Sequence, residues 1–141
     1  MSDYVFTLNG GAVYWKSFKQ HTVADSVYKA EYIATSDVAK EAVWLQKFII
    51  ELEVVPSIDG PILLHCDSSS AIAQAKEPKS HHRTKHVLQR YHLVREIVNR
   101  GNVELQKIDG KENLADPFTK ALRIKEFDDF QWKMRIRYCP N

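Results

Sequence analysis

The sequence predicts an α/β fold in which helices flank a mixed sheet, and three observations support this class. Asn9-Gly10-Gly11 separates two runs rich in β-branched and aromatic residues, which indicates an N-terminal hairpin. Residues 62–66 form a short apolar run, which is typical of a buried strand. After the hairpin, strand patterns alternate with helix patterns, an order that indicates a layered α/β sheet.

Local signals bound the elements in the first half of the chain. Ser26 is available as the N-cap of a long helix that must end before Pro56. Glu77-Pro78 ends a short helix in the same way. The elements predicted here are two hairpin strands, a long helix, a strand and a short helix, at 3–8, 12–18, 26–52, 62–66 and 68–76.

Similar local signals bound the elements in the second half of the chain. Gly101 is suited to the position after a helix that ends at Arg100. Residues 103–108 alternate as a half-buried strand, and Asp109-Gly110 forms a turn. Asp116-Pro117 is an N-cap followed by proline, which predicts a helix through Leu122. The tail from 123 has no clear period, so we expect one domain over 1–122 and a C-terminal tail over 123–141.

Composition limits the function classes. The 20 Lys and Arg nearly balance the 18 Asp and Glu, so nucleic-acid binding would need a local basic patch. The two cysteines, Cys66 and Cys139, do not suggest a disulfide framework, and Cys66 is expected to be a buried strand thiol. No apolar run approaches the ~18 residues of a membrane span. We expect a cytoplasmic or nuclear protein that does not bind membranes.

Glu31 interrupts an apolar stripe on the long helix. Residues at steps of three and four define this stripe, which should pack on the sheet: Val27, Ala34, Val38, Ala42, Leu45, Ile49 and Leu52. An unpaired buried carboxylate costs several kcal/mol, so Glu31 needs a cation, a metal or a wet cleft. Alternatively, Glu31 lies at the solvent edge of the stripe.

Two further carboxylates stand at the ends of elements. Asp67 follows the apolar strand, at the sheet edge where α/β folds bind ligands, and Asp116 starts a helix. With Glu31, they could converge as oxygen ligands for Mg²⁺ or Mn²⁺. Two such ions held ~3.5–4 Å apart can activate water and stabilise the leaving oxygen of a phosphodiester. The simpler alternative is that Asp67 and Asp116 each cap the helix that follows them.

Several segments, in order, resemble the ribonuclease H domain of copia-type retrotransposon Pol polyproteins. They are NGGAVYWKSFKQHTVADS, AEYIA, AKEAVWLQKFI, CDSSSAIAQAKEP, TKHVLQRYHLVREI and NLADPFTKAL, and MRIRYC resembles the tail of plant members. The resemblance covers nearly the whole chain. It implies a ribonuclease H-like fold and hydrolysis of the RNA strand of RNA–DNA hybrids with Mg²⁺ or Mn²⁺. It also implies a reverse transcriptase domain upstream in the same polyprotein.

The resemblance assigns the same three carboxylates. The family's active-site Glu in A-E-Y falls on Glu31, and the Asp residues of C-D and L-A-D fall on Asp67 and Asp116. The family usually has Asn after C-D, where this chain has Ser68. Ser68 is a predicted nucleic-acid contact.

The chain departs from the family pattern at its N-terminus. The family's first metal-binding Asp lies on a central strand before the hairpin, and the 141 residues contain neither. Asp3 does not replace it, because Asp3 falls on the motif's Gly position. Without that strand its neighbours would expose unpaired backbone groups. We therefore expect the chain alone to be marginally stable and inactive, or to be completed by a strand from a partner chain.

A basic cluster precedes and enters the helix that ends at Arg100. It could contact the phosphates of a hybrid in a sequence-independent way, or it is simply a solvated loop. The residues predicted to bind nucleic acid there are Lys79, Arg83, Lys85, His86 and Arg90. Tyr91, and the tryptophans Trp15 and Trp44, are expected in the core or at its rim.

Two functions therefore compete at this point. The first is a metal-dependent hybrid nuclease that belongs to a Pol polyprotein. The second is a non-catalytic relic or domesticated module that keeps the fold and binds nucleic acid.

Overall fold

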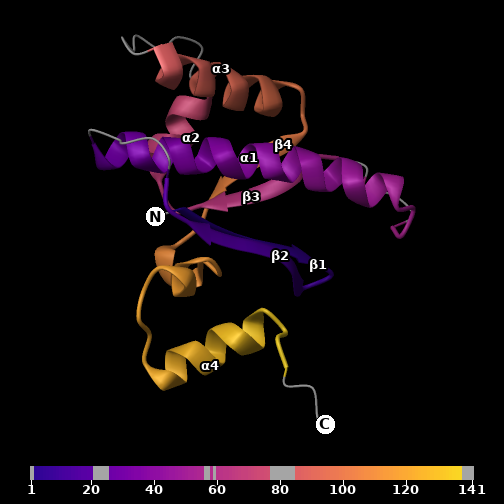
Figure 1. Ribbon diagram of the computed structural model, residues 1–141, viewed down its shortest axis with the longest axis vertical. Helices are drawn as coiled ribbons and strands as arrows, with labels where there is room; N and C mark the ends of the chain where they lie inside the picture. The colour runs from indigo at the N-terminus through magenta and orange to yellow at the C-terminus, as the bar shows by residue number, and fades with distance from the viewer. Residues whose placement is uncertain (1, 21–25, 56–57, 59, 77–84, 138–141) are drawn as a thin grey trace. The chain divides into compact units, whose positions relative to one another are not determined.

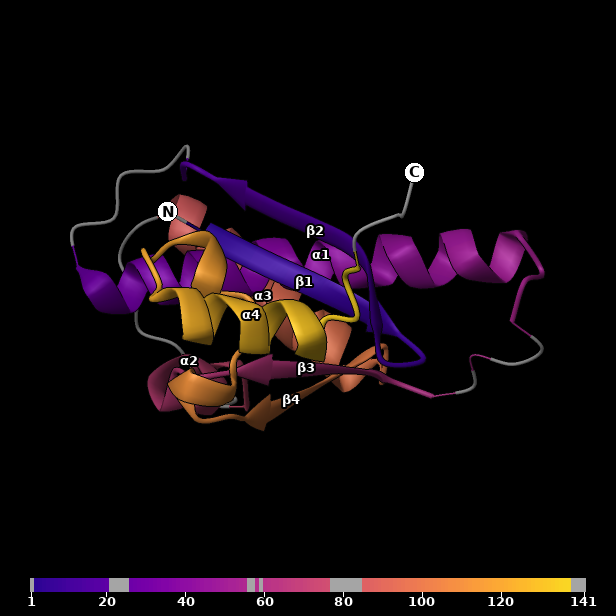
Figure 2. The ribbon, with the colours of Figure 1, turned by 90° about the horizontal axis from the view of Figure 1, so that it is seen from below.

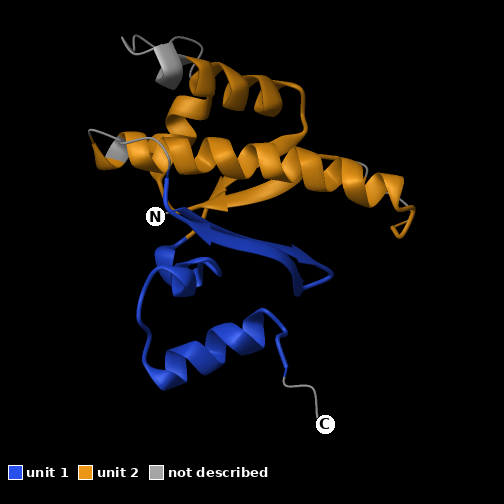
Figure 3. Cartoon of the chain, viewed as in Figure 1, with its two compact units in different colours: residues 1–22, 109–141 blue, residues 23–108 orange. Residues whose placement is uncertain are grey.

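The computed structural model describes residues 2–20, 26–55, 58, 60–76 and 85–137, without the side chains of Tyr28 and 85–88. These residues form a mixed α/β structure of strands, α-helices and two 3₁₀ turns (Figure 1). The chain divides into two compact units, unit 1 with residues 1–22 and 109–141 and unit 2 with residues 23–108 (Figure 3). Each unit is described by itself.

Unit 1 begins with the predicted hairpin, which is confirmed. Strand β1 (Ser2–Leu8) pairs antiparallel with β2 (Gly11–Phe18), and Leu8 lies opposite Gly11. The two turn residues, Asn9 and Gly10, have φ of 51° and 80°. These left-handed values define a type I′ turn, which Asn-Gly accommodates with little strain and whose twist matches that of the strands.

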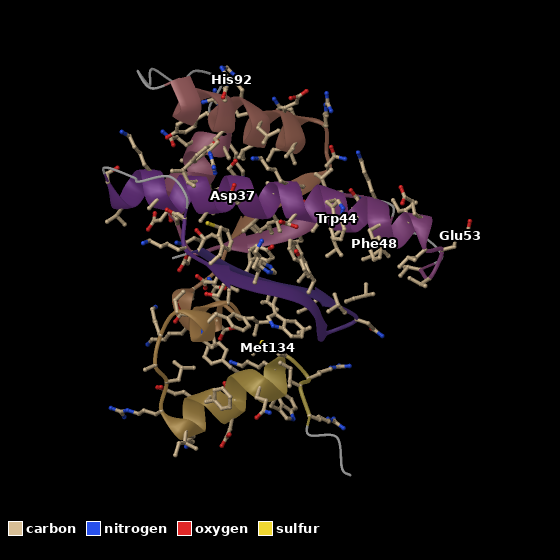
Figure 4. All side chains as sticks on the ribbon, in the orientation of Figure 1. Asp37, Trp44, Phe48, Glu53, His92 and Met134 are labelled. Carbon is tan, nitrogen blue, oxygen red and sulfur yellow. The ribbon has the colours of Figure 1, made fainter. Side chains whose placement is uncertain are left out.

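Part of the C-terminal tail forms a helix in unit 1, although the sequence of the tail has no clear period. Residues Ile124–Lys133 form helix α4, in which the backbone N–H of Arg123 donates to the carboxylate of Glu126 (3.2 Å). The Ala12 N–H donates to the carbonyl of Met134 (3.0 Å), which ties β2 to the residue that ends α4. Phe130 and Met134, four apart, are buried (Met134 is labelled in Figure 4).

In unit 2, the long helix α1 (Val27–Glu51) has the predicted bounds and cap. The Ser26 hydroxyl accepts from the Lys29 N–H (3.3 Å), which satisfies one of the free donors at the helix start. Helix α3 (Lys85–Asn99) ends as predicted, because Gly101 has a φ of 73° that suits glycine after a helix.

The sheet of unit 2 is a parallel pair. Strand β3 (Ile62–Cys66) pairs with β4 (Val103–Lys107), with Cys66 opposite Lys107 at their carboxyl ends. Helices α1, α2 (Ser69–Lys76) and α3 all pack with this pair (Figures 1 and 2). The single mixed sheet expected from the sequence is not formed by the described strands, which make two separate two-stranded sheets, one per unit.

The core of unit 2 centres on two tyrosines. The rings of Tyr32 on α1 and Tyr91 on α3 stack at 3.9 Å between centroids, and both residues are buried. The Tyr32 hydroxyl also donates to the Tyr91 backbone carbonyl (3.4 Å). The expectation that Tyr91 belongs to the core is confirmed.

The buried face of α1 differs from the predicted apolar stripe. Ala42 and Leu45 are buried as expected, but Val27 is 76% exposed. Tyr32, Ser36 and Ala39 are buried instead. Because α1 contacts two helices and both strands of unit 2, small residues on its inner side allow close approach and decide which face is covered.

Two aromatic residues predicted in the core or at its rim are exposed. Trp44 is 53% exposed and stacks on Phe48, one turn later on α1, at 5.3 Å between centroids (Figure 4). Trp15 on β2 is also largely exposed. Among the described residues, none of the helices combines the length and the apolar character needed to cross a membrane.

Candidate functional site

Glu31 and Asp67 are brought together in unit 2 around the end of β3. Glu31 is half-buried in the second turn of α1, and Asp67 is exposed directly after the last residue of the strand. The hydroxyl of Ser68 donates to Glu31 Oε2 at 2.5 Å. This bond joins α1 to the residue next to Asp67, so Glu31 is held at the carboxyl end of β3, one residue from Asp67 in the chain.

Ser68 also starts helix α2. Its Oγ accepts from the Ala71 N–H at 3.2 Å, and Ile72 N–H donates to the Ser68 carbonyl at 3.2 Å. Ser68 is therefore the N-cap, and the alternative that Asp67 caps this helix is wrong. The residue is only 7% exposed. Since its hydroxyl has these partners inside unit 2, its predicted contact with nucleic acid stays a prediction.

The thiol of Cys66 supports the same turn. Its Sγ accepts from the Ser68 N–H (3.4 Å) and lies 4.0 Å from Thr35 Oγ1 on α1. Burial raises the pKa of the Cys66 thiol, and the negative charges of Asp67 and Glu31 act in the same direction. The thiol is therefore neutral at pH 7 and serves as a hydrogen-bonding group rather than a nucleophile.

Lys107 is a residue of this site for which the sequence suggested no role. It ends β4 opposite Cys66, and its Nζ donates to the backbone carbonyl of Asp67. Lys107 thus bonds to the backbone carbonyl of Asp67 and not to its carboxylate. The sequence does not show that β4 pairs in parallel with β3, and only this register places residue 107 beside the end of β3.

Asp116 belongs to unit 1, and its predicted role as a helix cap is wrong. The residue begins a 3₁₀ turn (Asp116–Phe118) whose N-cap is Ala115, and the helix predicted through Leu122 does not form. Its carboxylate accepts from Lys120 Nζ at 2.6 Å, one turn later. Asn113 Oδ1 accepts from the Ala115 N–H (3.1 Å) and so fixes the approach to this turn.

The donor chemistry of Glu31 and Asp67 fits a hard divalent cation. Both offer carboxylate oxygens, the ligands that Mg²⁺ and Mn²⁺ prefer. In neither unit, however, do the described His, Cys, Asp and Glu side chains gather as a group of three able to hold a metal. Glu31 and Asp67 belong to unit 2, whereas Asp116 belongs to unit 1. A metal site formed by all three carboxylates therefore stays a prediction.

The predicted nucleic-acid contacts are only partly described. Lys79 and Arg83 lie outside the described residues, as do the side chains of Lys85 and His86, whose backbone opens α3. Arg90 is described, and its Nη1 donates to Asp37 Oδ1 on α1 at 2.7 Å (Asp37 is labelled in Figure 4). Both side chains are about three-quarters covered, so Arg90 links α1 to α3.

Replacing Arg90 with glutamine is expected to lower the free energy of unfolding by about 0.5–1 kcal/mol, since the ion pair is partly exposed. If the chain binds an RNA–DNA hybrid, the salt dependence of that binding should stay unchanged, because Arg90 already has a carboxylate partner. Urea unfolding and binding titrations at several salt concentrations measure the two effects. Asp37→Asn should lower stability to a similar extent. A reduced salt slope in Arg90→Gln alone would instead assign this residue to the phosphate backbone.

Comparison with known proteins shows that the chain is similar to retrovirus-related Pol polyproteins of plants. The Pol polyprotein from transposon TNT 1-94 of Nicotiana tabacum is 41% identical over 127 residues, which are 90% of this chain and 9% of the relative. Those from transposons RE2 and RE1 of Arabidopsis thaliana are each 31% identical over 145 residues, with 98% of this chain and 10% of the relative covered.

No family model and no solved structure matches the chain. The similarity to the plant polyproteins nevertheless extends over nearly all of its residues, while the chain spans about a tenth of their length. The chain is therefore a homologue of one segment of plant retrotransposon Pol polyproteins.

Proposed function

We propose that the chain is the ribonuclease H-type part of a retrotransposon Pol polyprotein and hydrolyses the RNA strand of RNA–DNA hybrids. One observation carries this proposal: Ser68, the residue after Asp67, donates to Glu31 at 2.5 Å at the carboxyl end of β3. The A-E-Y and C-D motifs, far apart in sequence, thus meet in unit 2. The similarity to Pol polyproteins supports the same assignment.

Each residue of the proposed site would have a distinct role. Glu31 and Asp67 would hold Mg²⁺ or Mn²⁺ through carboxylate oxygens, and Asp116 would complete the set. When bound, the cation supplies Lewis-acid activation of water and neutralises charge that develops on the phosphate. The Lys120 ammonium lies 2.6 Å from Asp116 and would have to be displaced by the cation. Lys107, held by the Asp67 carbonyl, adds positive charge beside the site.

The unpaired edges of the two described sheets are sites where a strand from a partner can be added. Among the described strands, β1 pairs with β2 and β3 pairs with β4, which leaves one backbone edge of each strand without a described strand partner. Such edges accept an added strand. We propose that a strand carrying a further carboxylate completes the domain, and that a reverse transcriptase domain belongs to the same polyprotein. A cytoplasmic or nuclear location follows from this proposal.

The function is tested by cleavage of an RNA–DNA hybrid labelled on the RNA strand, in Mg²⁺ and in Mn²⁺. Residues 1–141 are assayed alone and with a synthetic peptide that carries Gly-Tyr-X-Asp within an apolar strand sequence. We expect cleavage with the peptide and little without it, because three carboxylates repel one another and hold two cations weakly. A duplex DNA of the same sequence is the control and should stay intact.

The alternative is a non-catalytic module that binds nucleic acid. The pairing of Asp116 with Lys120 favours it, because a carboxylate neutralised by lysine needs no metal. Hybrid binding without cleavage, with or without the peptide and in both metals, would establish this alternative and end the nuclease proposal.

A further inference from the structure

We propose that Ser68 is a positioning residue that fixes the carboxylate of Glu31 for cation binding. This inference rests on the proposed function, since it explains how one of the proposed metal ligands is held. It goes beyond that function because it gives Ser68 a defined task in orienting another side chain. The role in nucleic-acid contact that the sequence suggested for this serine stays a separate prediction.

The hydrogen bonds of the Ser68 hydroxyl are fully accounted for. A serine hydroxyl has one proton to donate and two lone pairs that accept. The proton goes to Glu31 Oε2 (2.5 Å), and one lone pair accepts from the Ala71 N–H (3.2 Å). Ser70 Oγ lies 2.9 Å from Ser68 Oγ, and because the Ser68 proton is already used, Ser70 must be the donor. The hydroxyl is saturated, and its direction is fixed.

This saturation has a consequence for Glu31. A hydroxyl that accepts two hydrogen bonds is polarised and donates its own proton more strongly. The 2.5 Å distance lies in the range of bonds from a hydroxyl to a carboxylate. The bond occupies Oε2, so Glu31 would bind a cation through Oε1. A glutamate side chain otherwise loses rotamer freedom when it binds a ligand, and Ser68 removes that freedom beforehand.

Ser68 is itself held firmly. It is 7% exposed, its N–H donates to Cys66 Sγ (3.4 Å), and its carbonyl accepts from Ile72 N–H at the start of α2. Because Ser68 directly follows Asp67 in the chain, it ties the Glu31 carboxylate to the backbone next to Asp67. A fixed supporting residue of this kind is what a metal ligand on a long side chain requires.

The test distinguishes the role of Ser68 as the N-cap of α2 from its role in positioning Glu31. Ser68→Gly keeps a residue tolerated at the N-cap but removes the donor to Glu31, whereas Ser68→Thr keeps both functions. Ser26→Gly is the matched control, since Ser26 caps α1 by the same type of bond to Lys29 N–H and is exposed. Mn²⁺ affinity is measured by electron paramagnetic resonance on the 141-residue chain, alone and with the strand peptide. A thermal melt checks that each variant is folded.

We expect Ser68→Gly to bind Mn²⁺ about 10-fold more weakly, the lower end of the loss seen when an outer partner of a metal ligand is removed. Ser68→Thr and Ser26→Gly should bind like the wild type. Unchanged Mn²⁺ affinity in a folded Ser68→Gly variant would overturn the proposal and leave Ser68 as a helix cap only.

A second measurement needs no metal. Side-chain relaxation of the Glu31 methylene groups should show an ordered side chain in the wild type, in contrast to the exposed Glu51 at the end of the same helix. Equal disorder of Glu31 and Glu51 would overturn the positioning role. If the wild type binds no Mn²⁺ even with the strand peptide, while Glu31 is ordered and loses its order in Ser68→Gly, the proposed function fails but the positioning role stands.

Discussion

Replacing Asp67 with asparagine is expected to lower the rate of Mn²⁺-dependent hybrid cleavage by more than about 100-fold, since loss of an outer-shell partner of a metal ligand already costs about 10- to 100-fold. Asp67 lies at the carboxyl end of β3, beside the residue that holds Glu31. Asparagine keeps the shape of the side chain but removes the negative charge that would attract the cation. The measurement is the initial rate of hybrid cleavage in the presence of the strand peptide.

The matched control for Asp67→Asn is Asp128→Asn, the same change at an exposed carboxylate on α4. It should cleave at the wild-type rate. Hybrid affinity measured in EDTA should be similar in all three proteins, because phosphate contacts do not need the metal ligands. Cleavage that survives Asp67→Asn would remove the site assignment, even if the chain proved to be a nuclease.

Truncating Tyr91 to alanine is expected to lower the free energy of unfolding by about 3–5 kcal/mol, the usual cost of removing a buried aromatic side chain. Tyr91 is 0% exposed and stacks on Tyr32 at 3.9 Å, so its removal leaves a cavity between α1 and α3. The backbone carbonyl that accepts from Tyr32 stays in place. Since small domains are stable by only about 5–15 kcal/mol, this variant should be largely unfolded at moderate urea concentrations.

Phe48→Ala is the comparison for Tyr91→Ala, because it also removes an aromatic ring but at a position that is 43% exposed. It should cost less than about 1 kcal/mol, as is usual for surface substitutions. Circular dichroism during urea unfolding measures both variants. A small loss of stability in Tyr91→Ala, similar to that of Phe48→Ala, would show that the stacked tyrosines do not form the centre of the unit 2 core.

The local elements of this protein were predictable because their signals lie within a few residues. Asn9-Gly10 defines a turn with two left-handed residues, Ser26 caps α1, and Gly101 follows α3. Helix α4 was not predictable in this way, because neither Arg123 nor the aromatic residues after it give a clear boundary or period. The bond from Ala12 to Met134, a contact distant in sequence, holds its end, and Phe130 is buried.

By itself, the sequence determined the hairpin, the long helix, the strand that ends just before Asp67 and the residue types of the site. Only the tertiary structure decided which face of α1 is buried, since that depends on the helices and strands packed around it. It also decided that Ser68 joins Glu31 to the start of α2 and that Lys107 lies beside Asp67. Such contacts link residues about 40 positions apart, and no local pattern encodes them, because they exist only once the elements are packed.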